Sequence, residues 1–161
     1  TDEGVSWSDP VAEQFGVTDV NDSAQWESFF KSTVPTKRSG CISDLFGAFV
    51  DPNLLEMKSG VLACAFGLRI PHKLCWDNPT HELNGNYVAF SLDQGATWSH
   101  VVQLTSGVLT THYMDIQEIR ENELQVMYDI GHWHEDYWDG EKGRYTAVRN
   151  LSLKVDDQSR I

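Results

Sequence analysis

The segment from His132 to Asp139 holds the densest group of side chains that could do chemistry, and it reads His-Trp-His-Glu-Asp-Tyr-Trp-Asp. Two histidines beside carboxylates could bind a metal. Trp133 and His134 could instead contact a carbohydrate, because aromatic rings stack on the face of a sugar. In an extended segment, His132 and His134 lie on one side and Glu135 on the other, so we expect no metal. A solvated acidic loop is the remaining alternative.

The composition limits the partners that this chain can bind. The 161 residues carry a net charge of −12, which argues against nucleic acid and anionic membranes because phosphate binding requires an excess of Lys and Arg. The sequence has no apolar run of roughly 18 residues that would predict a membrane span. It has no phosphate-binding loop or nucleophile elbow, and we expect no cofactor. Among three cysteines, Cys64 lies in an apolar run, whereas Cys41 and Cys75 could pair.

A turn motif organises the strands that must position such loops. From Ser91 to Trp98 the chain reads Ser-Leu-Asp-Gln-Gly-Ala-Thr-Trp, between two apolar segments of strand-like composition. Asp93 can accept hydrogen bonds from turn amides two residues further on, and Gly95 supplies a backbone conformation that side chains resist. The Thr97 hydroxyl can close the turn, and the Trp98 ring can be buried against its own strands. The motif therefore predicts a tight hairpin.

This octet resembles the Asp-box, or BNR, repeat of sialidase-like β-propellers. A second copy opens the chain, where Asp2, Gly4, Ser6 and Trp7 take the places of the Asp, Gly, Thr and Trp of the octet. Repeats at the spacing of a propeller blade indicate a propeller or an array. The first copy lacks the strand that should lead into it, so we expect the chain to begin in the middle of a repeat.

The resemblance implies an all-β fold of four-stranded antiparallel blades with Asp-box turns. Strands are expected at residues 46–57, 60–66, 86–90, 100–104, 113–119, 123–129 and 144–155. We divide the single partial propeller domain into residues 1–20 as the last strand of an upstream blade, 21–45 as an insertion with a short helix, 46–105 as a complete blade and 112–155 as an incomplete blade.

The incomplete blade lacks a fourth strand, and exposed strand edges invite pairing with another chain. We therefore expect a homo-oligomer in which the first strand of one copy completes the last blade of the next, so that three copies form a six-bladed ring. Irregular association through side-chain contacts is the alternative.

In sialidase-like propellers the active site lies opposite the Asp-boxes. Tyr113 resembles the nucleophilic tyrosine of sialidases, which opens an innermost strand and is an exception to the two-carboxylate rule of glycosidases. A phenol needs a neighbouring base at neutral pH, and the candidates nearby in sequence are Asp115, Glu118 and Asp129. A wall residue that faces a ligand and a core residue are the alternative roles of Tyr113.

The resemblance also implies arginines that bind a substrate carboxylate through the guanidinium fork. Arg69 lies in a Gly-Leu-Arg-Ile-Pro segment that resembles a Gly-x-Arg-x-Pro pattern of Asp-box proteins. For Arg38 and Arg144, a surface salt bridge in an acidic protein is the alternative. The substrate-binding residues that we expect are Arg69, His72, His112, Trp133, His134 and Arg144.

Three functions follow as hypotheses. The first is a sialidase-like glycoside hydrolase that acts on a glycan, and the second is a non-catalytic carbohydrate-binding or interaction propeller that self-associates. The third is a truncated product without activity of its own, because a sialidase site draws residues from most of the ring and a symmetric trimer would only repeat the same few. The resemblance favours an extracellular or periplasmic location, with a cytoplasmic one as the alternative.

Overall fold

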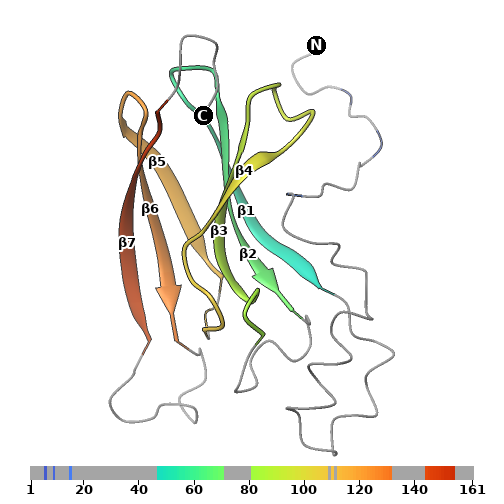
Figure 1. The fold of residues 1–161 in the computed structure, drawn as a ribbon, viewed down its shortest axis with the longest axis vertical. Coiled ribbons are helices and arrows are strands. Elements are labelled where there is room, and N and C mark those ends of the chain that lie inside the picture. The colour runs from blue at the N-terminus through green and yellow to red at the C-terminus, as the bar shows by residue number, and fades with distance from the viewer. Residues whose placement is uncertain are drawn as a thin grey trace, which may run out of the picture.

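The computed structural model describes residues 6, 9, 15, 47–70, 81–108, 110, 112–131 and 144–154. Within these residues every regular element is a β-strand, and the seven strands form two antiparallel sheets (Figure 1). The all-β class expected from the sequence is therefore confirmed. The short helix expected within residues 21–45 and the strand expected within residues 1–20 lie outside the described residues, as do Cys41 and Cys75.

The first sheet has four strands in the order β1-β2-β3-β4, and each strand pairs with its neighbour in the chain. Its strands are β1 (Ala48–Glu56), β2 (Leu62–Arg69), β3 (Gly85–Ser91) and β4 (Ser99–Gln103). The second sheet has the order β5-β6-β7, with β5 (Met114–Arg120), β6 (Glu123–Ile130) and β7 (Tyr145–Ser152). All seven strands lie where the sequence between residues 46 and 155 predicts them.

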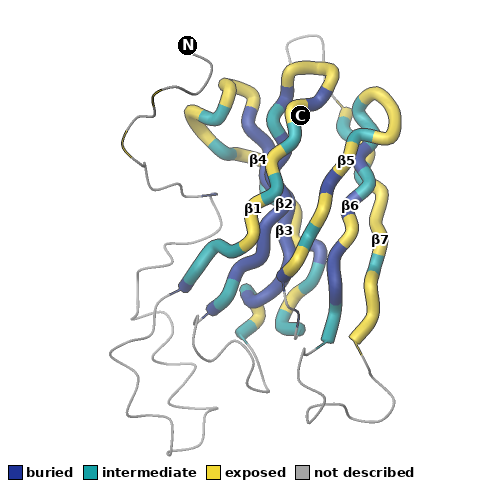
Figure 2. Tube along the Cα trace, turned by 180° about the vertical axis from the view of Figure 1, so that it is seen from behind, coloured by how far each residue is buried: buried dark blue, intermediate teal, exposed yellow. Residues whose placement is uncertain are grey.

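The two central strands of the first sheet, β2 and β3, are buried on both faces, whereas β1 and β4 are partly exposed. One face packs against the second sheet, where Ala65 and Val88 meet Ile116, Leu124 and Val126 in a shared core. Burial on both faces explains why β2 and β3 read as almost continuous apolar runs rather than as alternating ones (Figure 2).

The opposite face of the first sheet is closed by an aromatic cluster. Phe15, only 7% exposed, stacks on Phe66 with ring centroids 4.3 Å apart. It also makes edge contacts with Phe49 and Trp98 at 5.2 Å each. Cys64 is buried in the same cluster, as expected for a small apolar residue, and its burial raises the pKa of the thiol to about 11. A residue far from the sheet in sequence thus completes its core.

The turn that resembles an Asp-box, here called the Asp-box turn after that resemblance, joins β3 to β4 through side-chain hydrogen bonds. The carboxylate of Asp93 accepts hydrogen bonds from the Thr97 amide at 2.8 Å and from the Thr97 hydroxyl at 2.6 Å. The Ser91 hydroxyl donates to Asp93 at 2.8 Å and accepts from the Gly95 amide at 2.8 Å. Gly95 has a φ of +90°, which glycine adopts readily. Asp93 thus binds the amide four residues on, whereas the prediction placed its partner two residues on.

One end of the two sheets holds the short turns between strands, and the other end holds the strand ends next to the longer loops. The arrowheads of β2 and β6 point the same way in Figure 1, so the strands of the two sheets run in matching directions. The Asp-box turn therefore lies at the same end as the β1–β2 and β5–β6 turns, here called the turn end. The last residue of β2 and the first residues of β3, β5 and β7 lie at the other end, here called the loop end.

Candidate functional site

The loop end brings together side chains from the ends of four strands. Arg69 is the last residue of β2, His112 and Tyr113 directly precede β5, and Asp129 is near the end of β6. Arg144 directly precedes β7. Because these strand ends share one edge of the two packed sheets, four residues predicted from the sequence to bind or act on a substrate converge here, namely Arg69, His112, Tyr113 and Arg144.

His112 is fully buried and has an unusual backbone. Its φ of +66° lies in a region that is sparsely populated for residues other than glycine, and such conformations cluster at functional sites. Its ring lies directly against Gly67 of β2, where an added Cβ would come within 2.1 Å of the His112 Cβ. Only glycine at position 67 leaves room for this imidazole.

Arg69 and His112 form a hydrogen-bonded pair. The Arg69 Nε–H donates to His112 Nδ1 over 3.3 Å. Nδ1 is the acceptor in this contact, because a guanidinium nitrogen can only donate. The contact restrains the half-buried guanidinium of Arg69 through its Nε. The buried His112 ring thus helps to position the Arg69 side chain through this hydrogen bond.

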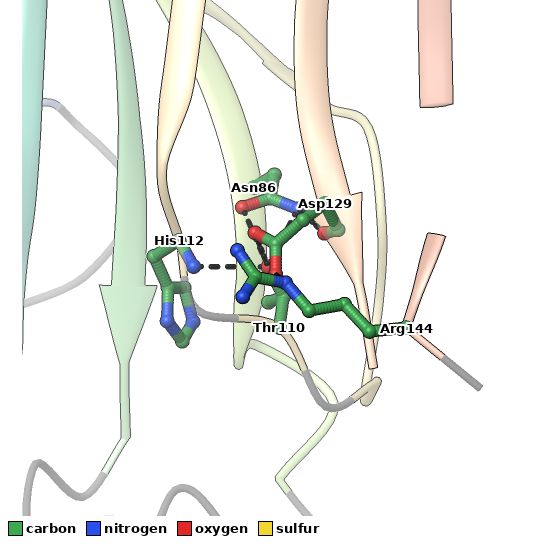
Figure 3. Close-up of polar contacts among 5 residues, drawn as sticks. All are labelled: Asn86, Thr110, His112, Asp129 and Arg144. Atoms are coloured by element: carbon green, nitrogen blue, oxygen red, sulfur yellow. Dashed lines mark hydrogen bonds and ion pairs between the residues drawn. The ribbon is translucent and has the colours of Figure 1, made fainter. Parts of the chain in front are cut away.

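A second group of contacts is centred on Thr110 (Figure 3). The Thr110 hydroxyl accepts a hydrogen bond from the His112 amide at 3.0 Å and donates to the Asp129 carboxylate at 3.1 Å. The other oxygen of Asp129 forms an ion pair with Arg144 Nε at 3.2 Å. Asn86 donates to Thr110 and to the Asp129 carbonyl, both at 3.3 Å. A continuous chain of contacts therefore leads from Arg69 to Arg144.

The start of β3 is tied into the same region. The Asn84 side chain accepts the amide of Ile70 at 3.3 Å, which joins the end of β2 to the start of β3. The Tyr87 hydroxyl donates to the Leu83 carbonyl at 2.7 Å, and burial, followed by the nearby Glu82 charge, raises the pKa of this phenol. Burial lowers the pKa of His81, which keeps that ring neutral near pH 7. The side chains of Asn84 and Tyr87 therefore hold the start of β3 in place through hydrogen bonds of uncharged groups.

Of the three residues proposed for catalysis, Tyr113 and Asp115 lie near the loop end, whereas Glu118 lies toward the turn end. Tyr113 is 61% exposed at the loop end, and Asp115 lies on the same side of the strand because it is two residues away. The Asp115 carboxylate accepts a hydrogen bond from Asn53 of β1 at 3.0 Å. Glu118 is five residues after Tyr113 in the chain. At about 3.3 Å per residue in a strand, this separates the two by about 16 Å. The Glu118 carboxylate accepts the amides of Lys58 and Asn122 at 2.9 and 3.0 Å, so the structure does not bring Glu118 to Tyr113.

The remaining predicted site residues lie outside the described residues, and they are Asp2, Gly4, Trp7, Arg38, His72, Trp133 and His134. Conversely, sequence reasoning missed Gly67, Asn86 and Thr110 as parts of the cluster. Asn86 carried a usable signal, because a buried polar residue beside an apolar strand needs a hydrogen-bond partner. Gly67 carried a signal only as the first residue of the Gly-Leu-Arg-Ile-Pro segment, and Thr110 carried none that distinguishes it from an ordinary loop threonine.

The cluster can present guanidinium groups to a ligand. Arg144 is 41% exposed through its side chain, whereas its partner Asp129 is almost fully buried, so the pair offers N–H donors rather than a free carboxylate to solvent. Arg69 adds a second guanidinium. Such forks bind carboxylates and hydroxyl groups in fixed geometry. Among the described residues, no group of three or more His, Cys, Asp and Glu side chains could hold a metal ion.

A cleft of about 470 Å³ lies elsewhere, between β4 and the residues at the end of β7. Its walls are mainly apolar, with Phe90, Val101 and Leu151 among them, and His100 and Lys154 also line it. The cleft is at the turn end. It therefore shares none of the polar residues of the cluster, and we place the candidate site at the loop end on the basis of its buried, hydrogen-bonded charges.

No family model, curated protein or solved structure matches this chain. The part of the chain that the structure describes has no helix of the length and apolar character that crossing a membrane requires.

Proposed function

We propose that this chain is part of a sialidase-like Asp-box propeller that binds a carbohydrate at its loop end. The observation that carries the proposal is the chain of contacts from Arg69 through His112, Thr110 and Asp129 to Arg144. It lies at the end of the sheets opposite the Asp-box turn, and in sialidase-like propellers the ligand site also lies opposite these turns.

The arrangement of the strands supports the propeller part of the proposal. The first sheet is a four-stranded antiparallel meander, the second has three strands of the same kind, and the sheets pack face to face. The first strands of the two sheets contact each other through the Asn53–Asp115 hydrogen bond. Neighbouring blades of a propeller meet in this way, with their innermost strands side by side.

The chemistry of the loop end supports a carbohydrate that bears a carboxylate. The chain has a net charge of −12, so its overall field repels anions. Arg69 and Arg144 counter that field locally and offer donors to carboxylate and hydroxyl oxygens. The exposed ring of Tyr113 adds an apolar surface with a polar tip at the same end.

Binding can be tested by calorimetric titration of the chain with sialylated and neutral oligosaccharides. We expect the sialylated sugar to bind and Arg69→Gln to weaken binding by about tenfold or more, because one charge-assisted hydrogen-bonding group is lost. Arg120→Gln is the matched control, since Arg120 lies at the turn end and pairs with Glu123 at 3.2 Å. Failure of both sugars to bind, or an equal loss in the control, would contradict the proposal.

Sialidase-like hydrolysis is the second candidate, and the exposed position of Tyr113 two residues before Asp115 favours it. In that reaction the tyrosine oxygen attacks the anomeric carbon while a carboxylate accepts the phenolic proton, and the glycosidic bond breaks so that the aglycone leaves with its oxygen. Water then hydrolyses the bond between sugar and tyrosine. Release of the fluorophore from 4-methylumbelliferyl sialic acid measures this reaction directly. We expect any activity to be lost in Tyr113→Phe, while binding of the sialylated sugar is retained. Activity that survives Tyr113→Phe would rule out this mechanism.

A further inference from the structure

The two sheets have four outer edges, and three of them are interrupted. β1 carries Pro52, a positive φ at Asp51 and a register shift between Val50 and Asn53. The pairing of β3 with β4 shifts between Val88 and Phe90, and β5 shifts against β6 near its end. Proline, bulges and short strands are the devices by which proteins prevent edge strands from pairing with other chains.

The edge formed by β7 lacks these devices. β7 pairs with β6 over eight consecutive residue pairs without a register shift, and its sequence Tyr-Thr-Ala-Val-Arg-Asn-Leu-Ser contains no proline. Among the described residues, none pairs with its far side. Tyr145 and Val148 are more than half exposed, Val148 by 51%. β7 is thus a long, regular and partly apolar edge, which is the kind that accepts another strand.

Charge favours a second copy as the partner. The chain has a net charge of −12, which makes most contacts between copies repulsive. β7 contains no Asp or Glu, and its one charged residue is Arg149. Two copies can therefore approach each other along this strand with less repulsion than along an acidic surface.

The sequence of β7 is complementary to itself when two copies run antiparallel about a twofold axis at Val148. In that register Val148 faces its own counterpart, Tyr145 faces Leu151, and Thr146 faces Asn150. Apolar pairs and hydrogen-bonding pairs directly across strands stabilise sheets. A shift of the axis by one residue would place Arg149 opposite Arg149, which is unfavourable for like charges.

Two other surfaces are less suited to join copies. Phe15 already covers the far face of the first sheet from within the same chain. The outer face of the second sheet carries a row of polar side chains, in which Gln117 bonds to Gln125 at 3.0 Å and Gln125 to Asn150 at 3.4 Å. The exposed apolar side chains of that face, Met127 at 41% and Val148 at 51%, lie side by side on β6 and β7, next to the edge. The edge of β7 therefore combines apolar side chains with a strand side that no described residue pairs.

We propose that β7 pairs antiparallel with β7 of a second copy, so that the two three-stranded sheets become one six-stranded sheet across a twofold axis. This pairing does not depend on the carbohydrate site. It leaves the loop end of each copy accessible and needs no exchange of strands between copies.

Light scattering coupled to size exclusion, at several loading concentrations of the full chain, tests the pairing. We expect a mass of twice the chain mass of 18.2 kDa. Val148→Lys should raise the dimer dissociation constant by about tenfold, because two ammonium groups would then face each other across the axis. Leu54→Lys is the matched control, since Leu54 is an exposed aliphatic residue on the interrupted edge of β1. Circular dichroism checks that both variants fold.

Cross-linking provides an independent readout. A Val148→Cys chain should form a disulfide-linked dimer under mild oxidation, whereas Leu54→Cys should not exceed the background of the unmodified chain. A monomer at all concentrations would overturn the proposal. A trimer would overturn it as well, because strand exchange into a ring would then be the mode of association. Equal weakening of the dimer by Val148→Lys and Leu54→Lys would remove β7 from the interface.

Discussion

At the scale of single residues, the candidate site depends on a close approach between a glycine and a histidine. His112 adopts a left-handed backbone and rests against Gly67, and from this place it holds the guanidinium of Arg69. His112 is one of the substrate-binding residues expected from the sequence, and Gly67 opens the Gly-Leu-Arg-Ile-Pro segment. The sequence does not show that the two touch, because they lie far apart in the chain. The half-buried arginine that would contact a ligand is therefore placed by residues that do not touch the ligand.

Gly67→Ala tests this dependence. The new Cβ would lie 2.1 Å from the Cβ of His112, so we expect a loss of about 3 kcal/mol in the free energy of unfolding from overpacking, together with weaker sugar binding because Arg69 loses its support. Urea denaturation and calorimetry measure the two effects. Gly60→Ala is the control: it has open space but a φ of +83°, so it should cost about 1 kcal/mol and leave sugar binding unchanged. Unchanged stability in Gly67→Ala would contradict the observed packing.

Asp93 makes the Asp-box turn sensitive to pH. Hydrogen bonds from the Thr97 side chain and amide, and then from Ser91, lower the pKa of Asp93 below its ordinary value of 3.8. The ionised carboxylate therefore stabilises the fold at neutral pH, and this contribution is lost as the pH falls from the ordinary value through the lowered one. We expect Asp93→Ala to lower the melting temperature at pH 7, and the difference from the unmodified chain to shrink below about pH 4.

Gln94→Ala is the control for this measurement, because it alters the same turn without removing a charge. Its effect on the melting temperature should be the same at pH 7 and at pH 3. A constant difference between Asp93→Ala and the unmodified chain across this range would show that the carboxylate charge does not contribute.

At the scale of elements, the strands are predictable and their connections are only partly so. Alternating and continuous apolar patterns place all seven strands, and the Ser-x-Asp-x-Gly-x-Thr-Trp octet identifies the β3–β4 turn. The sequence also names Arg69, Tyr113 and Arg144 as candidate site residues, without showing that they lie at one end. It could not show that Thr110 and Asn86 link them, since these contacts span 19 to 43 residues of chain.

Glu118 is a residue for which sequence spacing suggested a contact that the structure does not form. From sequence spacing it is a candidate base for Tyr113, yet its carboxylate joins two turns at the turn end by accepting the amides of Lys58 and Asn122. We expect Glu118→Ala to lower the free energy of unfolding by about 1–3 kcal/mol, because two backbone amides lose a charged acceptor. Glu118→Gln keeps one acceptor oxygen and should lose less. Urea denaturation of the two variants gives both values.

Activity separates the two roles of Glu118. If the chain hydrolyses a sialoside, the structural role requires that Glu118→Gln retain the activity of the folded protein. A variant with unchanged stability and abolished hydrolysis would instead support the catalytic role that spacing suggests.

At the scale of the whole molecule, the first sheet is enclosed and the second is open. The second sheet covers one face of the first sheet, and the aromatic cluster with Phe15 covers the other. The outer face of the second sheet is lined by polar side chains. Phe15 could not be assigned this role from the sequence, because a single aromatic residue outside any periodic pattern does not reveal what it packs against.

Phe15→Ala measures how much the first sheet depends on this contact. Removal of a buried phenylalanine that stacks on Phe66 at 4.3 Å should lower the free energy of unfolding by about 3–5 kcal/mol. Leu54→Ala, at a position 61% exposed, should change it by less than about 0.5 kcal/mol. Chemical denaturation of the chain measures the free energy of unfolding of both variants. If Phe15→Ala reduces the oligomer mass instead of the stability of each copy, then Phe15 acts between copies rather than within one.

The burial of Cys64 at the centre of β2 has a consequence for how the molecule can be observed. A thiol whose pKa is raised to about 11 is almost entirely protonated at neutral pH, and only the thiolate reacts with alkylating reagents. Labelling at this position therefore requires the first sheet to separate from its neighbours. The rate of labelling at Cys64 then reports how often that sheet opens, so this native thiol serves as a probe of local opening.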